Sequence, residues 1–285
     1  MKTIVIAGGT DGIGKALAAT RLGNGDTVVV IGRSEVKGKA FLESAATVGA
    51  QDRAFFIPAD LSLLGENERV LKKLRARFPT IDALVLCARH YRTERALTAD
   101  GIEENFALFY LSRYLLGHGL VDTLSAAERP VVVNVAGPGA SLSVVRWDDL
   151  ELRHGYHGGA ALGQGGKLND LLGVTFAERY GDSGIRYVLI HPGVTATSFS
   201  GEYDDVTLRQ ILSMQSFAKP VEAALPPIVD AIDAPPAEPL SAFVEGLRIG
   251  VKDRSFAPDA AERLDAATER ILEEHRGRTG GPGGN

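Results

Sequence analysis

The stretch TIVIAGGTDGIG, residues 3–14, decides the fold of this chain. Its first five residues form an apolar, largely β-branched run typical of a buried strand, and a G-x-x-x-G-x-G turn leads directly into a segment with helical spacing. Glycine lets the backbone turn sharply and approach a pyrophosphate, and amide groups at a helix start attract that anion. A tight turn without a ligand is the simpler alternative. The residues expected to bind a dinucleotide here are Gly8, Thr10, Asp11, Gly12, Ile13 and Gly14.

Further apolar runs of the same kind predict a sheet. They are TVVVI (27–31), AFFIP (54–58), ALVLC (83–87), PVVVNV (130–135) and RYVLI (186–190), with SAFVEG (241–246) as a candidate seventh strand. Segments with helical spacing lie between or after them, at 13–24, 35–48, 64–78, 101–124, 160–180 and 258–276. Parallel strands need crossovers, and these cover both faces of the sheet. We therefore expect an α/β fold, a Rossmann-type doubly wound parallel sheet, in a single domain over residues 1–276.

The stretch 198–239 interrupts the alternation with two helical patterns, at 206–216 and 220–232. It follows the sixth strand at the carboxyl edge of the sheet, where ligands bind in such folds, so we expect a helical substrate lid. A packed surface excursion is the alternative. The glycine-rich tail, 277–285, is expected to be disordered.

Composition limits the partners. The chain has 285 residues, 45% of them hydrophobic, and a net charge of -5, which argues against a nucleic-acid surface. The lone cysteine, Cys87, allows no disulfide framework, and neither a signal peptide nor an apolar run of about 18 residues is found. We expect a cytoplasmic protein that binds a small molecule, with no metal, no membrane and no nucleic acid.

The end of the second predicted strand bears on the choice of cofactor. Gly32, Arg33 and Ser34 stand where an NAD site usually places a carboxylate for the ribose 2′-hydroxyl. Arg33 can instead pair with a 2′-phosphate, which favours NADP(H). Asp11 would oppose that phosphate, so NAD(H) stays open, as does the reading of Arg33 as an exposed turn residue.

These motifs together resemble those of the short-chain dehydrogenase/reductase superfamily. The features in question are the glycine turn, Asp60 and Leu61 after the third strand, Lys167 in the helix at 160–180, and HPGVTAT at 191–197. Three stretches are similar to the retinol-dehydrogenase-like branch: ALTADGIEENF (96–106), RWDDLELR (146–153) and GQGGKLND (163–170).

The resemblance implies further cofactor contacts. Asp60 and Leu61 would flank the adenine, and Ala88 and Arg89 would lie near the cofactor ribose. Lys167 would hold the hydroxyls of the nicotinamide ribose, and Pro192, Val194 and Thr197 would meet the carboxamide. A helix cap, a solvated charge and a simple turn are the alternatives for Asp60, Lys167 and Pro192.

The chain departs from the family where the proton is supplied. A tyrosine four residues before the lysine normally protonates the substrate oxygen. Gly163 stands there, or Leu162 if the doubled glycine marks an insertion. The serine position after the fifth strand holds Ala136 and Gly137, and Phe109 is met where the family has an asparagine. The candidate replacement donors are Tyr156 and His90, followed by His157, Ser141, Ser143, Arg89 and Tyr91.

The sequence thus predicts an NAD(P)H-dependent ketoreductase of atypical active site. Similarity to triad-deficient reductases suggests a ketone of an aromatic polyketide, angucyclinone-like antibiotic intermediate, reduced by direct hydride transfer without a tyrosine acid. The alternatives are a non-redox cyclase or isomerase and an inactive NADP(H)-binding sensor. The oligomeric state stays open, because glycines at 158, 159, 163, 165 and 166 make the start of the helix at 160–180 a poor helix former.

Overall fold

The computed structural model describes residues 1–199 and 201–279 and contains the predicted parallel sheet. Its strands lie in the order β10-β9-β7-β6-β4-β1-β2-β3, and all neighbours are parallel except β9 and β10. Their bounds are β1 Thr3–Ala7, β2 Thr27–Gly32, β3 Ala54–Pro58, β4 Ala83–Leu86, β6 Val131–Val135, β7 Arg186–His191, β9 Leu240–Val244 and β10 Leu247–Ile249. The doubly wound fold is confirmed, and β9 is the seventh parallel strand that SAFVEG suggested.

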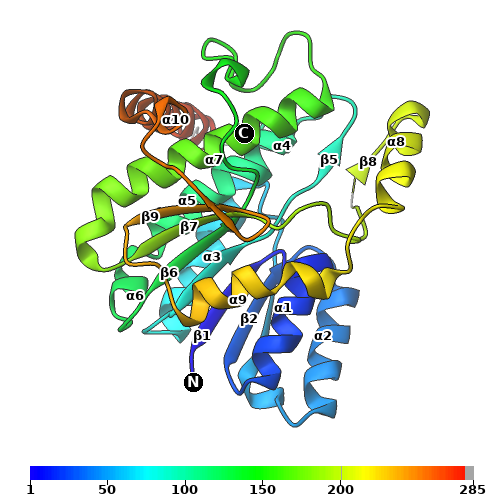
Figure 1. The fold of residues 1–285 in the computed structure, drawn as a ribbon, viewed down its shortest axis with the longest axis vertical. Helices are drawn as coiled ribbons and strands as arrows, with labels where there is room; N and C mark the ends of the chain where they lie inside the picture. The colour runs from blue at the N-terminus through cyan, green and yellow to red at the C-terminus, as the bar shows by residue number, and fades with distance from the viewer. Residues whose placement is uncertain (200, 280–285) are drawn as a thin grey trace, which may run out of the picture.

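Helices cover both faces of this sheet (Figure 1). One face carries α1 Gly12–Gly23, α2 Glu35–Thr47 and α9 Pro226–Asp233; the other carries α3 Leu64–Arg77, α5 Ser112–Gly119 and α7 Gly158–Tyr180. Alternate strand residues enter the two layers: Ile4 and Ile6 pack on one side, Val5 and Ala7 on the other. Because both faces are buried, the strands are apolar throughout, which is why the sequence displays them so clearly.

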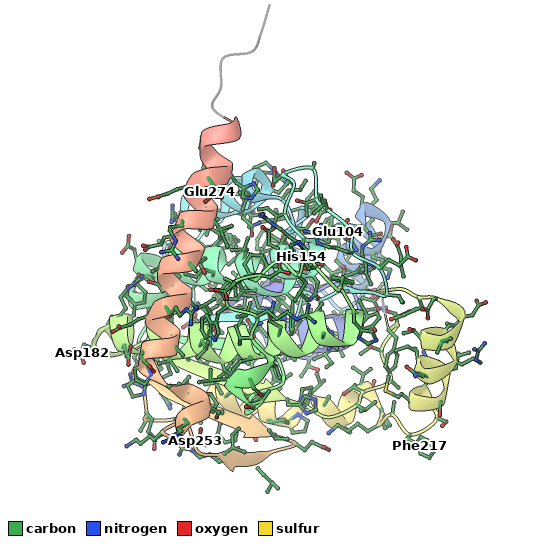
Figure 2. The ribbon with its side chains drawn as sticks, turned by 90° about the horizontal axis from the view of Figure 1, so that it is seen from above. Glu104, His154, Asp182, Phe217, Asp253 and Glu274 are labelled. Atoms are coloured by element: carbon green, nitrogen blue, oxygen red, sulfur yellow. The ribbon has the colours of Figure 1, made fainter. Side chains whose placement is uncertain are left out.

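One helical prediction needs correction, and one is confirmed with a longer helix. The expected helix at 101–124 is divided into α4 Glu104–Phe106, a π-helical turn Ala107–Leu111, α5 and α6 Val121–Ser125. Helix α10, Pro258–Thr279, lies outside α7 and continues into the expected disordered tail at 277–279. Figure 2 shows it running along the outer side of the molecule. The rest of that tail, 280–285, is outside the described residues.

The expected lid at 198–239 divides into two parts with different packing. Helix α9 is core, because Ile228 and Ile232 are fully buried against the sheet. Helix α8, Asp205–Gln215, stands to one side of the body (Figure 1), and Phe217 beyond it is 85% exposed. Only the first part of the insertion therefore has the exposure that a lid requires.

A small parallel sheet ties this first part to the loop after β4. Strand β5, Tyr91–Arg92, pairs with β8, Gly201–Glu202. Arg92 forms ion pairs with Glu202 and with Glu104 of α4, and Tyr91 stacks on Tyr203 with ring centroids 5.4 Å apart. The base of the insertion is thus anchored at the carboxyl edge of the main sheet.

The glycine-rich start of α7 is helical because several of its glycines allow close packing. A methyl group at Gly158 would lie 2.3 Å from the Arg92 carbonyl oxygen, and one at Gly165 would lie 2.6 Å from the Phe109 ring. Gly163 differs, since it is exposed and a methyl group there would meet nothing within 4 Å. Tertiary contacts therefore override the poor helix propensity.

This contrast predicts opposite stability effects in one helix. Gly163→Ala should raise the free energy of unfolding by roughly 0.5–1 kcal/mol, since alanine favours the helix and meets no neighbour. Gly165→Ala should lower it by about 1–3 kcal/mol through overpacking against Phe109. Thermal unfolding of both variants checks this, and shifts of the same sign would contradict the packing described.

Candidate active site

The carboxyl edge of the sheet brings together loops that the sequence placed far apart. A methyl group at Gly8 would lie 2.7 Å from the backbone nitrogen of Ala88, and one at Gly12 would lie 2.9 Å from Cγ2 of Thr197. The glycine turn therefore touches both the loop after β4 and the loop after β7. These are three of the segments that were expected to contact one dinucleotide.

The turn itself fits a pyrophosphate. Gly8 and Gly12 have φ angles of +82° and +49°, which favour glycine. A methyl group at Gly14 would lie 2.3 Å from the Gly8 carbonyl oxygen, so α1 begins in contact with the end of β1. Asp11 caps α1 by accepting a hydrogen bond from the Gly12 amide. The amides of the first helical turn then face the edge of the sheet, where a phosphate is stabilised.

The adenosine end carries a basic residue that the sequence analysis missed. Lys37 in α2 forms an ion pair with Asp11, which also accepts a hydrogen bond from Ser198 Oγ at 2.9 Å. Burial raises the pKa of Asp11, but these hydrogen bonds outweigh it and hold that pKa below its usual value. Since Lys37 compensates the Asp11 charge, the objection to a 2′-phosphate weakens. The half-exposed Arg33 lies 4.0 Å from Asp60.

Other predicted cofactor residues lie along the same edge with identifiable local roles. Ser34 caps α2 by accepting from the Lys37 amide, and Asp60 accepts hydrogen bonds from Ser62. Thr10 packs against Gly32, where a methyl group would lie 2.6 Å from the Thr10 hydroxyl. The remaining predicted residues range from buried to exposed: Leu61 and Pro192 are buried, Ile13 and Ala88 half-buried, and Arg89 and Val194 exposed.

The positions of the missing acid are filled by groups that cannot donate a proton. Gly163 is exposed, the edge beside β6 is formed by Ala136 and Gly137, and Phe109 is buried against Gly165. The π-helical turn that contains Phe109 also shifts the helical register, and Asn105 stands one turn earlier, buried in α4. That irregular turn has no signal in the hydrophobic spacing.

A second missed residue, His191, stands beside Gly137. Its Cδ2 atom would lie 3.7 Å from a methyl group at Gly137, and its buried Nδ1 has no hydrogen-bond partner among the described residues. Burial lowers the pKa of His191, so the ring is neutral at pH 7. The sequence feature that could have identified His191 is its place at the start of the HPGVTAT run, where β7 ends.

Lys167 is not brought to the cleft residues. Its side chain is fully buried, with Nζ 2.7 Å from Asp170 Oδ2, 2.9 Å from the Ser255 carbonyl oxygen and 4.9 Å from the Phe256 ring centre. Asp170 Oδ2 also accepts a hydrogen bond from the Gly139 amide. The ammonium therefore connects α7 to the segment before α10. The predicted ribose contact would require it to leave this ion pair.

The candidate proton donors, Tyr156 and His90, have the following surroundings. The Tyr156 hydroxyl donates to the Arg92 carbonyl oxygen at 3.4 Å, and burial together with Glu103 raises the pKa of Tyr156. His90 lines a cavity of about 10 Å³ with Arg33 and Asn105, and burial lowers its pKa. The secondary candidates have local roles: His157 caps α7, Ser141 and Ser143 bond to each other 3.0 Å apart, and Tyr91 stacks on Tyr203.

The edge, the glycine turn and the basic residues define a dinucleotide-binding protein of the Rossmann class. A solved short-chain dehydrogenase from Burkholderia cenocepacia, in complex with NADP, has the same fold. The two structures align with a TM-score of 0.66 and 18% sequence identity, and the alignment covers 86% of this chain and 96% of that one. Within the described residues, no helix is long and apolar enough to span a membrane, and no group of acidic, histidine or cysteine side chains forms a metal site.

The short chain dehydrogenase family model matches residues 2–147, and the chain belongs to this family. One relative is the short-chain dehydrogenase/reductase prx1 of Penicillium rubens, which is 30% identical over 73% of this chain and 62% of that protein. Another is the assigned daunorubicin C-13 ketoreductase DnrU of Streptomyces sp. (strain C5), which is 29% identical over 69% of this chain and 67% of that protein. Human retinol dehydrogenase 11 is 26% identical over 67% and 60%. The match thus spans less than two thirds of the prx1 protein.

The residues expected at the adenosine end predict a preference for NADPH over NADH that depends on Arg33. Arg33→Ala should weaken NADPH binding about 10- to 100-fold, the value of a charge-assisted pair, while NADH binding changes less than about threefold. Lys39→Ala also removes one positive charge, in this case from helix α2, and serves as the control. Fluorescence titration with both cofactors measures this, and an equal loss for NADPH and NADH would contradict the assignment.

Proposed function

We propose that this protein is an NADPH-dependent ketoreductase that reduces a ketone of an aromatic polyketide without a tyrosine acid. One observation carries the proposal. The segments suited to the dinucleotide converge at Gly8, Gly12 and Thr197, whereas the proton-donor positions hold Gly137 and Gly163. The chain thus lacks donor groups at these positions, while its glycine turn keeps the form that suits a dinucleotide.

The sizes of the two contributions to catalysis allow hydride transfer without a protein acid. A positioned general acid is worth roughly 3–5 kcal/mol of barrier, while holding the two reactants in a near-attack geometry is worth about 7–11 kcal/mol. When bound, the reduced nicotinamide would supply a hydride to the carbonyl carbon. The cradle at the start of α1 and the Arg33 side chain would hold it in place. Most of the barrier reduction thus depends on residues that the chain has.

The substrate class follows from the missing acid and from one relative. DnrU is assigned to a ketone of daunorubicin, an aromatic polyketide. A ketone with a neighbouring phenol carries its own hydrogen-bond donor, which can protonate the alkoxide as it forms. Such a substrate, of the angucyclinone kind, would need no tyrosine from the protein.

Paired substrates test the proposal. The purified protein is incubated with NADPH and either an aromatic ketone bearing an adjacent phenol or its methyl ether, and the loss of nicotinamide absorbance is followed. We expect the phenol to react at least about 100-fold faster, the value of a general acid. Equal rates would contradict a substrate-derived proton.

Two variants complete the test. Gly12→Ala introduces a methyl group against Thr197 and should abolish turnover of both substrates through loss of NADPH binding. His191→Asn removes the neutral imidazole beside Gly137 and should leave both the preference for the phenol and the rate with it intact; a similar loss of rate for both substrates would make His191 the donor. Wild-type protein that binds NADPH tightly but never oxidises it would indicate a sensor, and conversion of the polyketide without oxidation would indicate a cyclase or isomerase.

A further inference from the structure

A buried arginine lies directly beneath the two loops that border the nicotinamide end of the proposed site. Arg113 of α5 is 1% exposed. Its guanidinium donates to the Ala88 carbonyl oxygen at 3.0 Å, to the Val135 carbonyl oxygen at 3.0 Å and to the side-chain oxygen of Asn134. It thereby joins the ends of β4 and β6 from below.

The charge of Arg113 is not neutralised locally. In the part of the chain that the structure describes, no carboxylate forms an ion pair with it, and Nε has no hydrogen-bond partner. The guanidinium lies 4.5 Å from the Phe109 ring centre, so carbonyl dipoles and an aromatic face are its counterparts. Burial lowers the pKa of Arg113 to about 10, which still leaves it charged at pH 7.

Its neighbours are also polar and buried. Asn134 donates to Asn169 Oδ1 at 2.9 Å and to the Tyr187 hydroxyl at 2.7 Å, and Asn169 donates to the Phe109 and Gly165 carbonyl oxygens. These contacts hold the Asn134 oxygen toward the guanidinium. A buried cation without a counter-charge is expensive unless something compensates it, and the hydrogen bonds provide only part of that compensation.

The position of this charge relates it to the missing acid. Val135 directly precedes Ala136 and Gly137, the two residues at the family's serine position, and Ala88 contacts Gly8 of the cofactor turn. The Arg113 guanidinium therefore binds the carbonyl group that directly precedes the family's serine position and the carbonyl group of the loop that touches the cofactor turn.

We propose that Arg113 is a buried positioning residue whose uncompensated charge stabilises negative charge on an oxygen atom of the bound aromatic substrate. The inference rests on the proposed function for the identity of that oxygen. In the reaction, the carbonyl carbon gains a C–H bond from the hydride and is reduced, while NADPH is oxidised. The resulting alkoxide takes the proton of the adjacent phenol, and the phenolate left behind is reprotonated from water. Both anions form above Arg113, and each is favoured by a fixed positive charge in a site of low polarity.

The first test measures the charge without any hydride transfer. Alizarin, a hydroxyanthraquinone that changes colour on ionisation, is bound to the NADP⁺-loaded protein and titrated with pH. We expect the apparent pKa of the bound dye to lie about one unit lower in wild type and Arg113→Lys than in Arg113→Gln, a tenfold shift in its ionisation equilibrium. Asn134→Asp leaves Arg113 in place but adds a carboxylate beside it, so this variant should match Arg113→Gln.

The second test uses the phenol-bearing ketone and NADPH. Arg113→Gln and Asn134→Asp should lower kcat about 10- to 30-fold with KM for NADPH changed less than about threefold, and Arg113→Lys should recover most of the loss. Circular dichroism and NADPH titration establish that each variant is folded. Equal dye pKa values in all folded variants, or an equal kcat loss for Lys and Gln, would overturn the inference and leave Arg113 a structural link between β4 and β6. A dye shift in a protein that oxidises no NADPH would preserve the inference and refute the proposed reductase.

Discussion

The closeness of helix α1 to the end of β1 is the constraint on which the site depends. No side chain larger than hydrogen fits at Gly14, where a methyl group would lie 2.3 Å from the Gly8 carbonyl oxygen, or at Gly9, where it would lie 2.6 Å from Val30. With α1 fixed there, its first amides face the carboxyl edge of the sheet. The loops after β4 and β7 then pack on the same turn through Ala88 and Thr197. A shift of α1 would therefore disturb every segment of the cleft.

The sequence predicted those features that depend on local pattern. Buried parallel strands are continuous apolar runs, and the glycine turn has a fixed place between strand and helix, so the sheet and the cofactor half of the edge were predicted. The π-helical turn at Ala107–Leu111 and the core position of α9 depend on packing against distant elements. Lys167 forms its ion pair with Asp170 in the same helix, but its second partner, the Ser255 carbonyl oxygen, is 88 residues away. Similarity of motif alone could not provide that partner, and the ribose contact that it implies for Lys167 stays a prediction.

The two halves of the cleft are built on different physical principles. The half proposed for the cofactor presents backbone amides and exposed cations, which suit a charged ligand that arrives from water. The substrate half has no acid at the expected positions, and beneath it lies a network of Arg113, Asn134, Asn169 and Tyr187. An apolar replacement of similar volume at such a site is often no less stable. A stabilising role alone therefore does not account for the charge, whereas an effect on a ligand above it does.

The pairing of β5 with β8 also determines how the specificity of this protein can be altered. Strand β8 belongs to the insertion that follows β7, whereas β5 belongs to the loop that follows β4, and Arg92 joins both through Glu202 and Glu104. A chimera that exchanged residues 198–217 alone would separate the paired backbone groups of β5 and β8 and remove one of the two carboxylates that pair with Arg92. The exchangeable unit is discontinuous: the loop containing Tyr91–Arg92 must be transplanted together with the segment containing α8.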